Sequence, residues 1–214
     1  ALILVDAAAQ DLAGDLARQL VEAGRKVVVA GPEGLAASDG VGTALDVRSG
    51  DCSDQPWLES LLKELQVGEG ESLDVIHLFG ALAEESQPSA AAADRCAVAI
   101  AALKALSVKD AGLWLVTPGA MQHVAGGEAE RPVQAALWGF GRVAANEDAD
   151  VRIRMIDPAP DYEAARMAAL VGAEVLRPTN ERELVINDSG RHALRLRRGL
   201  PRRPETGGRR RREA

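Results

Sequence analysis

The chain has 214 residues, of which 47% are hydrophobic and only 3% aromatic. This length corresponds to one or two domains, and the even spread of apolar residues favours a single core built mainly from Ala, Leu and Val. Cys52 and Cys96 lie in segments predicted to be helical and form no paired motif, which favours a reduced, cytoplasmic protein. The opening ALILVDAAAQ has no basic segment and only a short apolar run, so we interpret it as a core strand rather than a signal peptide or membrane anchor.

Charge is distributed unevenly along the chain. Residues 195–214 contain nine Arg and two Glu, which gives this segment a net charge of +7. Because the whole chain has a net charge of −7, residues 1–194 have a net charge of −14. An acidic body argues against nucleic acid as a partner. We interpret residues 1–198 as the folded domain and residues 199–214 as an Arg/Pro/Gly-rich linker or cut end.

Strand-like and helix-like segments alternate along the chain. In chain order, we predict a strand at 2–5, a helix at about 12–23, strands at 26–30 and 43–47, a helix at 53–66, a strand at 73–80, a helix at 86–106, a strand at 112–119, a helix at 133–147, a strand at 151–157, a helix at 161–175, and a hairpin of strands at 182–188 and 191–197. Leucine spacing supports the first helix, which Gly24 ends. Ser53 or Asp54 would cap the second helix, which has Pro56 in its first turn.

The order of these segments predicts the fold class. Near-continuous apolar strands that alternate with helices are typical of a parallel sheet covered by helices on both faces. We therefore expect an α/β protein of the doubly wound, Rossmann-like type, closed by a C-terminal hairpin around Asp188 and Gly190.

A nucleotide-binding Rossmann fold needs a glycine-rich turn after its first strand, because the backbone must approach the pyrophosphate. Here the corresponding segment, VDAAAQDLAGDLA, has one glycine, Gly14, which falls inside the predicted helix. Asp6, Asp11 and Asp15 bring negative charge to the place where a phosphate would lie. We interpret Asp11 as an N-cap or first-turn acid of the helix, and we expect no dinucleotide to bind at this turn.

Catalytic motifs are missing as well. The single tyrosine, Tyr162, begins a late predicted helix and has Arg166, not lysine, four residues later. His77, His123 and His192 are dispersed, and their spacing indicates no metal site. His77 lies on a strand predicted to be buried, where a core imidazole is the simpler interpretation, and no nucleophile elbow is present.

One long motif points to a family. VQAALWGFGRVAANE (133–147), preceded by LWLVTPGAMQ and followed by VRIRMIDPAP, resembles the ketoreductase structural subdomain of modular type I polyketide synthases. LDVIHLFGAL and ERELVINDSGRHALRLRRG are similar to a buried strand and the closing hairpin of that subdomain, so the resemblance covers about residues 1–198.

The resemblance implies a truncated, degenerate short-chain dehydrogenase-like unit that binds no cofactor. In that family, such a unit packs against a catalytic half that holds NADPH and the Tyr/Ser/Lys/Asn set. The parent synthase performs acyl transfer and NADPH-dependent reduction. Neighbours implied for this chain are a ketoreductase catalytic half, an enoylreductase or, if it is a pseudo-ketoreductase, a methyltransferase.

Alignment with a working short-chain reductase places Glu130 where the catalytic tyrosine would stand and Gln134 where the lysine would stand. Thr117 or Pro118 falls near the expected serine. Glutamate cannot replace a phenol as the acid that protonates an alkoxide, and Gln134 supplies no positive charge. We therefore expect no catalytic, cofactor-binding or metal-binding residues in this chain.

The two glycines of the motif need an explanation, because glycine inside a helix costs about 0.5–1 kcal/mol relative to alanine. We expect a packing seam, within the chain or against a neighbouring domain, where a partner approaches the helix backbone closely. Arg142 would bond a carboxylate or carbonyl across it. An ordinary core helix with tolerated glycines is the simpler alternative. The predicted seam consists of Trp138, Gly139, Phe140, Gly141 and Arg142.

Two other functions are compatible with parts of the sequence. A degenerate receiver domain would use Asp46 as the aspartate that ends its third strand, but the fifth predicted strand lacks the lysine that a receiver requires. An atypical NADP-dependent short-chain reductase would have to work without the glycine-rich turn. Both have less support in the residues than the structural subdomain.

Overall fold

In a computed structural model of the chain, residues 1–35, 45–65, 72–83, 87–106, 111–127, 131–148 and 150–195 are described. Within these ranges, eight strands form one sheet, in the order β3-β2-β1-β4-β5-β6-β7-β8. The strands are β1 (Leu2–Leu4), β2 (Val28–Gly31), β3 (Asp46–Ser49), β4 (Asp74–His77), β5 (Gly112–Val116), β6 (Arg152–Pro158), β7 (Glu183–Asn187) and β8 (Gly190–Ala193). All neighbours pair in parallel except β7 and β8, which form the expected antiparallel hairpin.

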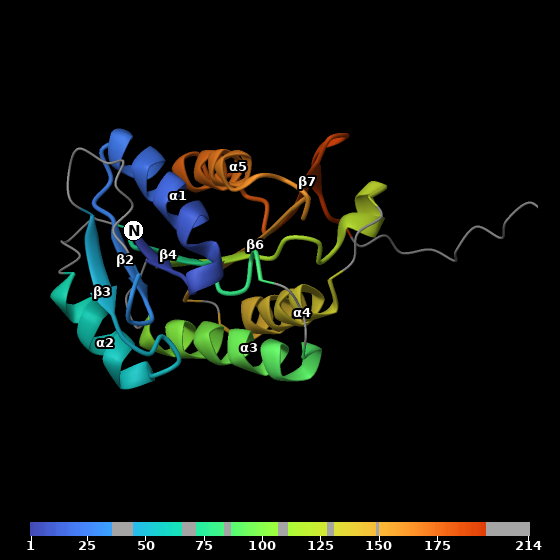
Figure 1. Cartoon of the computed structure of the whole chain (residues 1–214). Coiled ribbons are helices and arrows are strands. Elements are labelled where there is room, and N and C mark those ends of the chain that lie inside the picture. Colours follow the sequence, from blue (N-terminus) through green and yellow to red (C-terminus); the bar gives the residue numbers. More distant parts are fainter. Residues whose placement is uncertain are drawn as a thin grey trace, which may run out of the picture.

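Helices cover both faces of this sheet (Figure 1). They are α1 (Gln10–Glu22), α2 (Gln55–Glu64), α3 (Pro88–Ala105), α4 (Pro132–Glu147) and α5 (Ala164–Leu176), with short 3-10 helices η1 (Ala7–Ala9) and η2 (Gln122–Ala125). Helices α1 and α5 pack together on one face, and α2, α3 and α4 lie on the other. The predicted fold class is therefore confirmed.

The sheet separates two apolar cores. Successive residues of a strand point to opposite faces, so Leu2 and Leu4 join the core beneath α2, α3 and α4, while Ile3 and Val5 join the core beneath α1 and α5. Alternation of this kind lets short strands of three to seven residues be buried on both faces. It also explains why the strands read as continuous apolar runs rather than as alternating ones.

A buried tryptophan fixes one end of the sheet. The indole Nε1 of Trp114 donates to Oδ1 of Asp74 at 2.9 Å. The other carboxylate oxygen, Oδ2, accepts from Nη2 of Arg25 at 2.6 Å. Asp74 is only 7% exposed, so both bonds supply the hydrogen-bonding that burial of its carboxylate requires. The guanidinium of Arg154 lies 5.0 Å from the Trp114 ring centroid.

Several predicted boundaries were wrong, and the reasons are local. The first helix begins at Gln10, because η1 leads directly into it, and Ala9 rather than Asp11 is its N-cap residue. Asp11 does lie in the first turn of α1. Cys52 precedes α2 and is not helical, whereas Cys96 lies within α3. The last helix begins at Ala164, after Tyr162 rather than with it.

Strand ends also differ from the prediction. Strand β4 ends at His77 and β5 ends at Val116, because Gly80 and Gly119 take positive φ angles of 69° and 85° and turn the chain. Strand β3 begins at Asp46, later than predicted, because this exposed edge strand lacks an apolar pattern. Strand β8 ends at Ala193. The proposed boundary between 198 and 199 and the tail lie outside the described residues.

Candidate functional site

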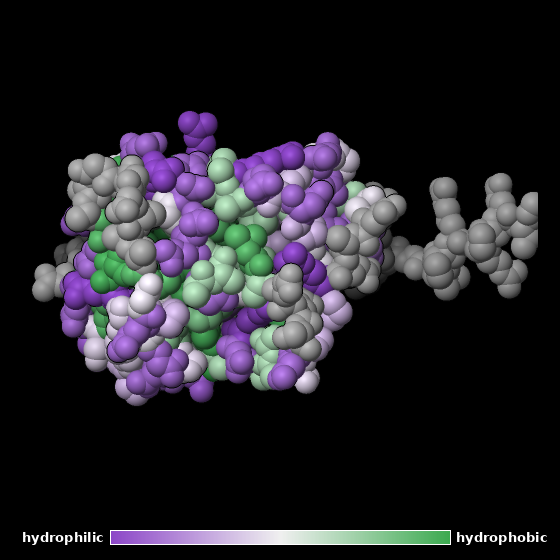
Figure 2. Space-filling view, in the orientation of Figure 1, coloured by the Kyte–Doolittle hydropathy of each residue, from purple (hydrophilic) through white to green (hydrophobic). Residues whose placement is uncertain are grey.

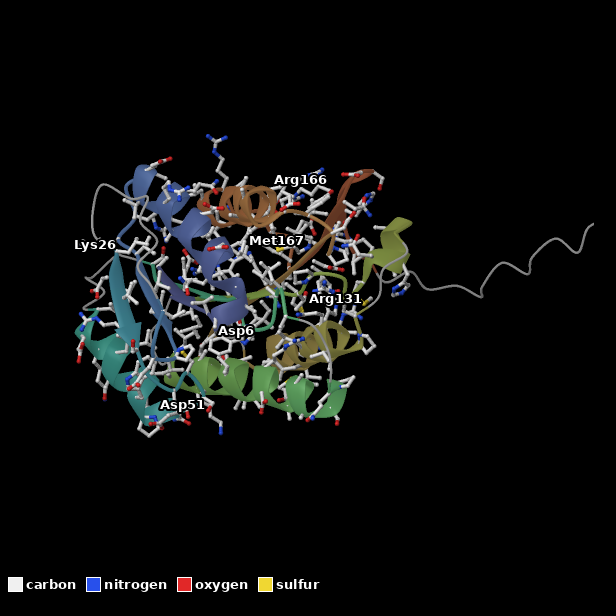
Figure 3. The ribbon with its side chains drawn as sticks, viewed as in Figure 1. Asp6, Lys26, Asp51, Arg131, Arg166 and Met167 are labelled. Carbon is white, nitrogen blue, oxygen red and sulfur yellow. The ribbon has the colours of Figure 1, made fainter. Side chains whose placement is uncertain are left out.

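In doubly wound sheets, ligands bind at the carboxyl ends of the strands where the strand order reverses. In this protein that point lies between β1 and β4, since β2 and β3 continue on one side and β5 to β8 on the other. Asp6 follows β1 there, and Gly80 lies in the turn after β4. Figure 3 shows Asp6 at the start of helix α1, in the middle of the molecule.

The side chain of Asp6 occupies this switch point. Its Oδ1 accepts a hydrogen bond from the backbone N–H of Ala9 at 3.0 Å. Its Oδ2 accepts one from the backbone N–H of Gly80 at 2.6 Å. One carboxylate thus bonds a backbone donor from η1 and another from the β4 turn.

The β4 turn is also held from the side of α4. The carbonyl of Gly80 accepts from Nε2 of Gln134 at 2.7 Å, and the carbonyl of Ala81 accepts from Nη1 of Arg131 at 3.2 Å. The side chain of Arg95 packs so closely on Gly80 that a Cβ there would lie 1.8 Å from its Nε. A positive φ and this contact together require glycine at position 80.

The positions that correspond to catalytic residues are committed to structure. Gln134 is fully buried, and its Nε2 donates to the carbonyl of Gly80 in the β4 turn. The amide at the expected lysine position therefore stabilises that turn. Thr117 is fully buried as well, and its hydroxyl lies 3.4 Å from the carbonyl of Ile156. Glu130 lies outside the described residues. The structure thus bonds Gln134 to the turn at the switch point, and it bonds the Thr117 hydroxyl to a carbonyl of β6.

Tyr162 takes part in a separate polar cluster near the C-terminal hairpin. Its hydroxyl donates to Oδ1 of Asp188 at 2.9 Å, and Arg166 bonds the same oxygen at 2.7 Å. The Arg166 guanidinium lies 3.6 Å from the centroid of the tyrosine ring. Burial, followed by the bond to Asp188, raises the pKa of Tyr162. A phenol held in this way is a packing element of the hairpin.

The histidines do not come together. His77 is fully buried on β4, and its Nε2 lies 3.1 Å from the carbonyl of Arg95. Burial lowers the pKa of His77 to about 4, so its ring stays neutral at ordinary pH. His192 bonds Ser189 in the hairpin turn, while His123 lies on η2. Within the described residues, no group of three or more His, Cys, Asp or Glu side chains could hold a metal ion.

A buried carboxylate, which the sequence analysis missed, organises the turn after β5. Asp157, at the end of β6, accepts backbone N–H bonds from Gly119 at 2.6 Å, Ala120 at 3.2 Å and Met121 at 2.5 Å. Burial raises the pKa of Asp157 to about 6, although these hydrogen bonds oppose the rise. Asp6 and Asp157 share one signal: each is an aspartate at the carboxyl end of a buried strand.

The predicted packing seam divides into two faces of α4. Gly141 is buried, and a Cβ there would lie 2.6 Å from Sδ of Met155 and 2.8 Å from Cδ1 of Leu115. Gly139 is exposed, and, apart from its chain neighbours and the backbone of its own helix, no atom of the described residues lies within 4 Å of the position of its Cβ. The close approach at Gly141 is therefore internal, against the sheet, whereas Gly139 makes none within the described part of the chain.

The other seam residues anchor α4 to the sheet. Trp138 is 1% exposed, and Phe140 is half-buried against the same core. Both Nε and Nη2 of Arg142 donate to Oε2 of Glu183 on β7, at 2.9 and 2.5 Å. The Arg142 guanidinium also lies 5.9 Å from the centroid of the Trp138 ring. Arg142 thus bonds a carboxylate across a contact between a helix and a strand.

The arrangement of strands differs from that of a receiver domain. Receivers have the strand order 2-1-3-4-5, whereas here β1 lies between β2 and β4. Asp46 is the first residue of β3 rather than its last, and it is exposed in an ion pair with Arg48 at 2.7 Å. The receiver interpretation was therefore wrong.

Among the helices that the structure describes, none combines the length and the apolar character that a membrane span requires.

Known proteins with related sequences are polyketide synthases. Residues 6–196 match the family described as "Polyketide synthase extender module SpnB, Rossmann fold domain". Pikromycin polyketide synthase component PikAIII of Streptomyces venezuelae is 32% identical over 184 residues, which is 82% of this chain and 11% of that protein. Polyketide synthase GfsA of Streptomyces halstedii is 40% identical over 91 residues, 42% of this chain and 1% of that protein.

Solved structures agree with the sequence comparison. A structure described as an A1-type ketoreductase superposes with a TM-score of 0.58 at 25% identity, covering 97% of this chain and 40% of that one. A short-chain dehydrogenase/reductase from Vibrio parahaemolyticus superposes with a TM-score of 0.63 at 14% identity, covering 87% of this chain and 99% of that one. This chain therefore spans a small part of its polyketide synthase relatives, and it belongs to the Rossmann-fold domain family of polyketide synthase extender modules.

Proposed function

We propose that this chain is a non-catalytic structural subdomain that supports a neighbouring catalytic domain in the β-carbon processing of carrier-bound polyketide intermediates. The observation that carries the proposal is the state of the switch point. There Asp6 bonds the backbone donors of Ala9 and Gly80, and Gln134 bonds the Gly80 carbonyl. The backbone donors and the side chain that a working reductase would turn toward a cofactor are thus occupied by bonds within this chain.

The chemistry of the remaining positions supports the same conclusion. A short-chain reductase needs a cation beside its proton donor to depress the donor's pKa, and the neutral Gln134 cannot provide it. Asp6 would place a negative charge against a pyrophosphate. An atypical active reductase would have to break the bonds of Asp6 and the bond of Gln134 to Gly80 before it could bind NADPH. We therefore do not favour that alternative.

The coverage of related structures supports a partner within the same synthase. This chain corresponds to 40% of the A1-type ketoreductase structure, so that structure contains a second portion larger than the first. We propose that a ketoreductase catalytic half, an enoylreductase or a methyltransferase stands beside this chain in the parent cytoplasmic synthase. NADPH would then be the cofactor of that partner and not of this chain.

We propose that helices α3 and α4 carry the surface for that partner, here called the α3/α4 face. It consists of exposed, small or apolar residues on both helices, namely Ala93, Ala97 and Ile100 on α3 and Ala136, Gly139 and Val143 on α4. Ile100 and Val143 are 39% and 54% exposed. The two helices pack side by side beneath the sheet (Figure 1). Open space at Gly139 would let a partner helix approach the backbone of α4.

Substitution of single exposed valines tests this proposal. Val143→Asp places a charge on the α3/α4 face, whereas Val124→Asp makes the same change at a 49% exposed valine on η2, away from that face. Both variants should unfold at nearly the wild-type temperature, because neither position is buried. Titration calorimetry with a separately produced candidate catalytic half should show binding to the wild type and to Val124→Asp.

Loss of binding only in Val143→Asp would support the α3/α4 face as the docking surface. Equal binding by both variants would contradict that assignment. Binding of no candidate half by the wild-type chain, with each half shown to be folded, would contradict the structural-subdomain proposal itself.

A further inference from the structure

The carboxylate of Asp6 lies where a doubly wound nucleotide-binding protein would hold an anionic ligand. We infer that Asp6 is an internal substitute for that ligand, and that its bond to Gly80 keeps the turn after β4 closed over the switch point. This closure is called here the Asp6 latch. It concerns the chain alone and does not depend on which domain the chain supports.

Two backbone donors from separate elements converge on the same side chain. The N–H of Ala9 comes from the turn that leads into α1, and the N–H of Gly80 comes from the turn after β4. In nucleotide-binding folds, unpaired N–H groups at the start of the first helix bind phosphate oxygens. Here one carboxylate supplies both acceptors at 3.0 and 2.6 Å, and bonds to a charged acceptor are stronger than neutral ones.

The surface above the latch is consistent with a site that receives no anion. Ala7 and Ala8 are exposed at the start of α1, where a nucleotide-binding turn would have glycines. Figure 2 shows apolar residues gathered at the surface around this end of α1. Methyl groups prevent the close backbone approach that a pyrophosphate requires. The anion at this position is therefore part of the protein.

The turn after β4 is held from two sides, which makes the latch separable from the fold. On the side of α1, the Gly80 N–H donates to the Asp6 carboxylate at 2.6 Å. On the side of α4, Gln134 and Arg131 bond the carbonyls of Gly80 and Ala81. Removal of the Asp6 carboxylate should release the Gly80 amide while the contacts to α4 and the sheet persist.

Amide hydrogen exchange at Gly80, measured by NMR on the full chain, tests the inference. In Asp6→Ala, exchange at this amide should be at least about tenfold faster than in the wild type, because a partly buried bond to a charged acceptor is lost. Asp11→Ala is the matched control: it removes an exposed carboxylate from the first turn of α1, five residues after Asp6, and should leave Gly80 exchange unchanged.

Inorganic phosphate provides the second arm. At matched ionic strength, phosphate should slow Gly80 exchange in Asp6→Ala and leave the wild type unaffected. Only the variant frees the Gly80 N–H and removes the competing carboxylate, while the Ala9 N–H keeps its 3.2 Å bond to the Asp6 carbonyl. If Asp6→Ala does not fold, Asp6→Asn carries the test, since its single oxygen should give intermediate protection. Wild-type protection of Gly80 in the folded Asp6 variants would overturn the latch, and no effect of phosphate on Asp6→Ala would overturn the role as ligand substitute.

Discussion

Two glycines in one helix offer a direct test of how α4 is packed. Gly139 and Gly141 are both interior to the helix, but their surroundings differ: Gly139 faces open space, and Gly141 faces Met155 and Leu115. Alanine at either position gains about 0.5–1 kcal/mol of helix propensity. At Gly139 nothing opposes this gain, so Gly139→Ala should stabilise the isolated chain by about that amount.

At Gly141 the gain meets a steric cost. The new methyl group would lie 2.6 Å from Sδ of Met155 and 2.8 Å from Cδ1 of Leu115, and both side chains are almost fully buried. Overpacking of a filled core costs about 1–3 kcal/mol. The net effect of Gly141→Ala should be a loss of about 0–2.5 kcal/mol, and the steric cost alone sets the two variants about 2 kcal/mol apart.

Urea unfolding followed by tryptophan fluorescence measures this difference, and thermal unfolding should separate the two midpoints by about 4–8 °C. A Gly141→Ala variant at least as stable as Gly139→Ala would refute the packing described for α4. The larger Gly139→Leu then addresses the external part of the seam. It should leave the stability of the isolated chain close to that of the wild type and impair docking of a neighbouring domain, and normal docking would remove Gly139 from the seam.

Three further predictions follow from buried polar groups and one ion pair. Burial raises the pKa of Asp157 from 3.8 to about 6, so the folded state binds the carboxyl proton of Asp157 more tightly than the unfolded state does. The contribution of Asp157 to the unfolding free energy is therefore full below about pH 4. It falls by up to about 3 kcal/mol as the pH rises through 6. Urea titrations at pH 4.5 and 7 should show this decline in the wild type relative to Asp157→Asn, and an equal difference at both pH values would contradict it. Trp114→Phe removes the donor to Asp74 and should lower the unfolding free energy by about 1–3 kcal/mol in urea; a loss below about 0.5 kcal/mol would show that the bond contributes little. Arg142→Ala breaks the ion pair with Glu183, in which the Arg142 side chain is 42% exposed, and should cost no more than about 1 kcal/mol in the same assay. A loss above about 3 kcal/mol would indicate a role beyond the ion pair.

The fold could be predicted because its signals are local. Apolar runs with helical or strand periodicity placed every strand and helix of the described sheet within a few residues, and the turn at Gly190 indicated the antiparallel hairpin. The exposed edge strand β3 was the least well placed, since only one of its sides pairs and its residues are mostly exposed. Boundaries set by glycine turns and by the 3-10 turn at Ala7–Ala9 also escaped the pattern.

Contacts at the switch point could not be predicted, because their partners are distant in sequence. Asp6 bonds Gly80 across 74 positions, and Gln134 bonds the same residue across 54. The sequence indicated only that Asp6 brings charge to a place unsuited to phosphate. Likewise, two glycines separated by one residue lie on different faces of a helix, and only the structure shows that Gly141 alone meets the sheet.

Calorimetric titration of the isolated chain with NADPH, repeated after addition of a candidate catalytic half, tests whether this domain binds a cofactor. With Asp6 bonded to Gly80 at the switch point, we expect no binding by the chain alone, and binding with turnover only in the mixture. Saturable binding of NADPH by the chain alone would contradict the non-catalytic role and would place a working cofactor site in this domain.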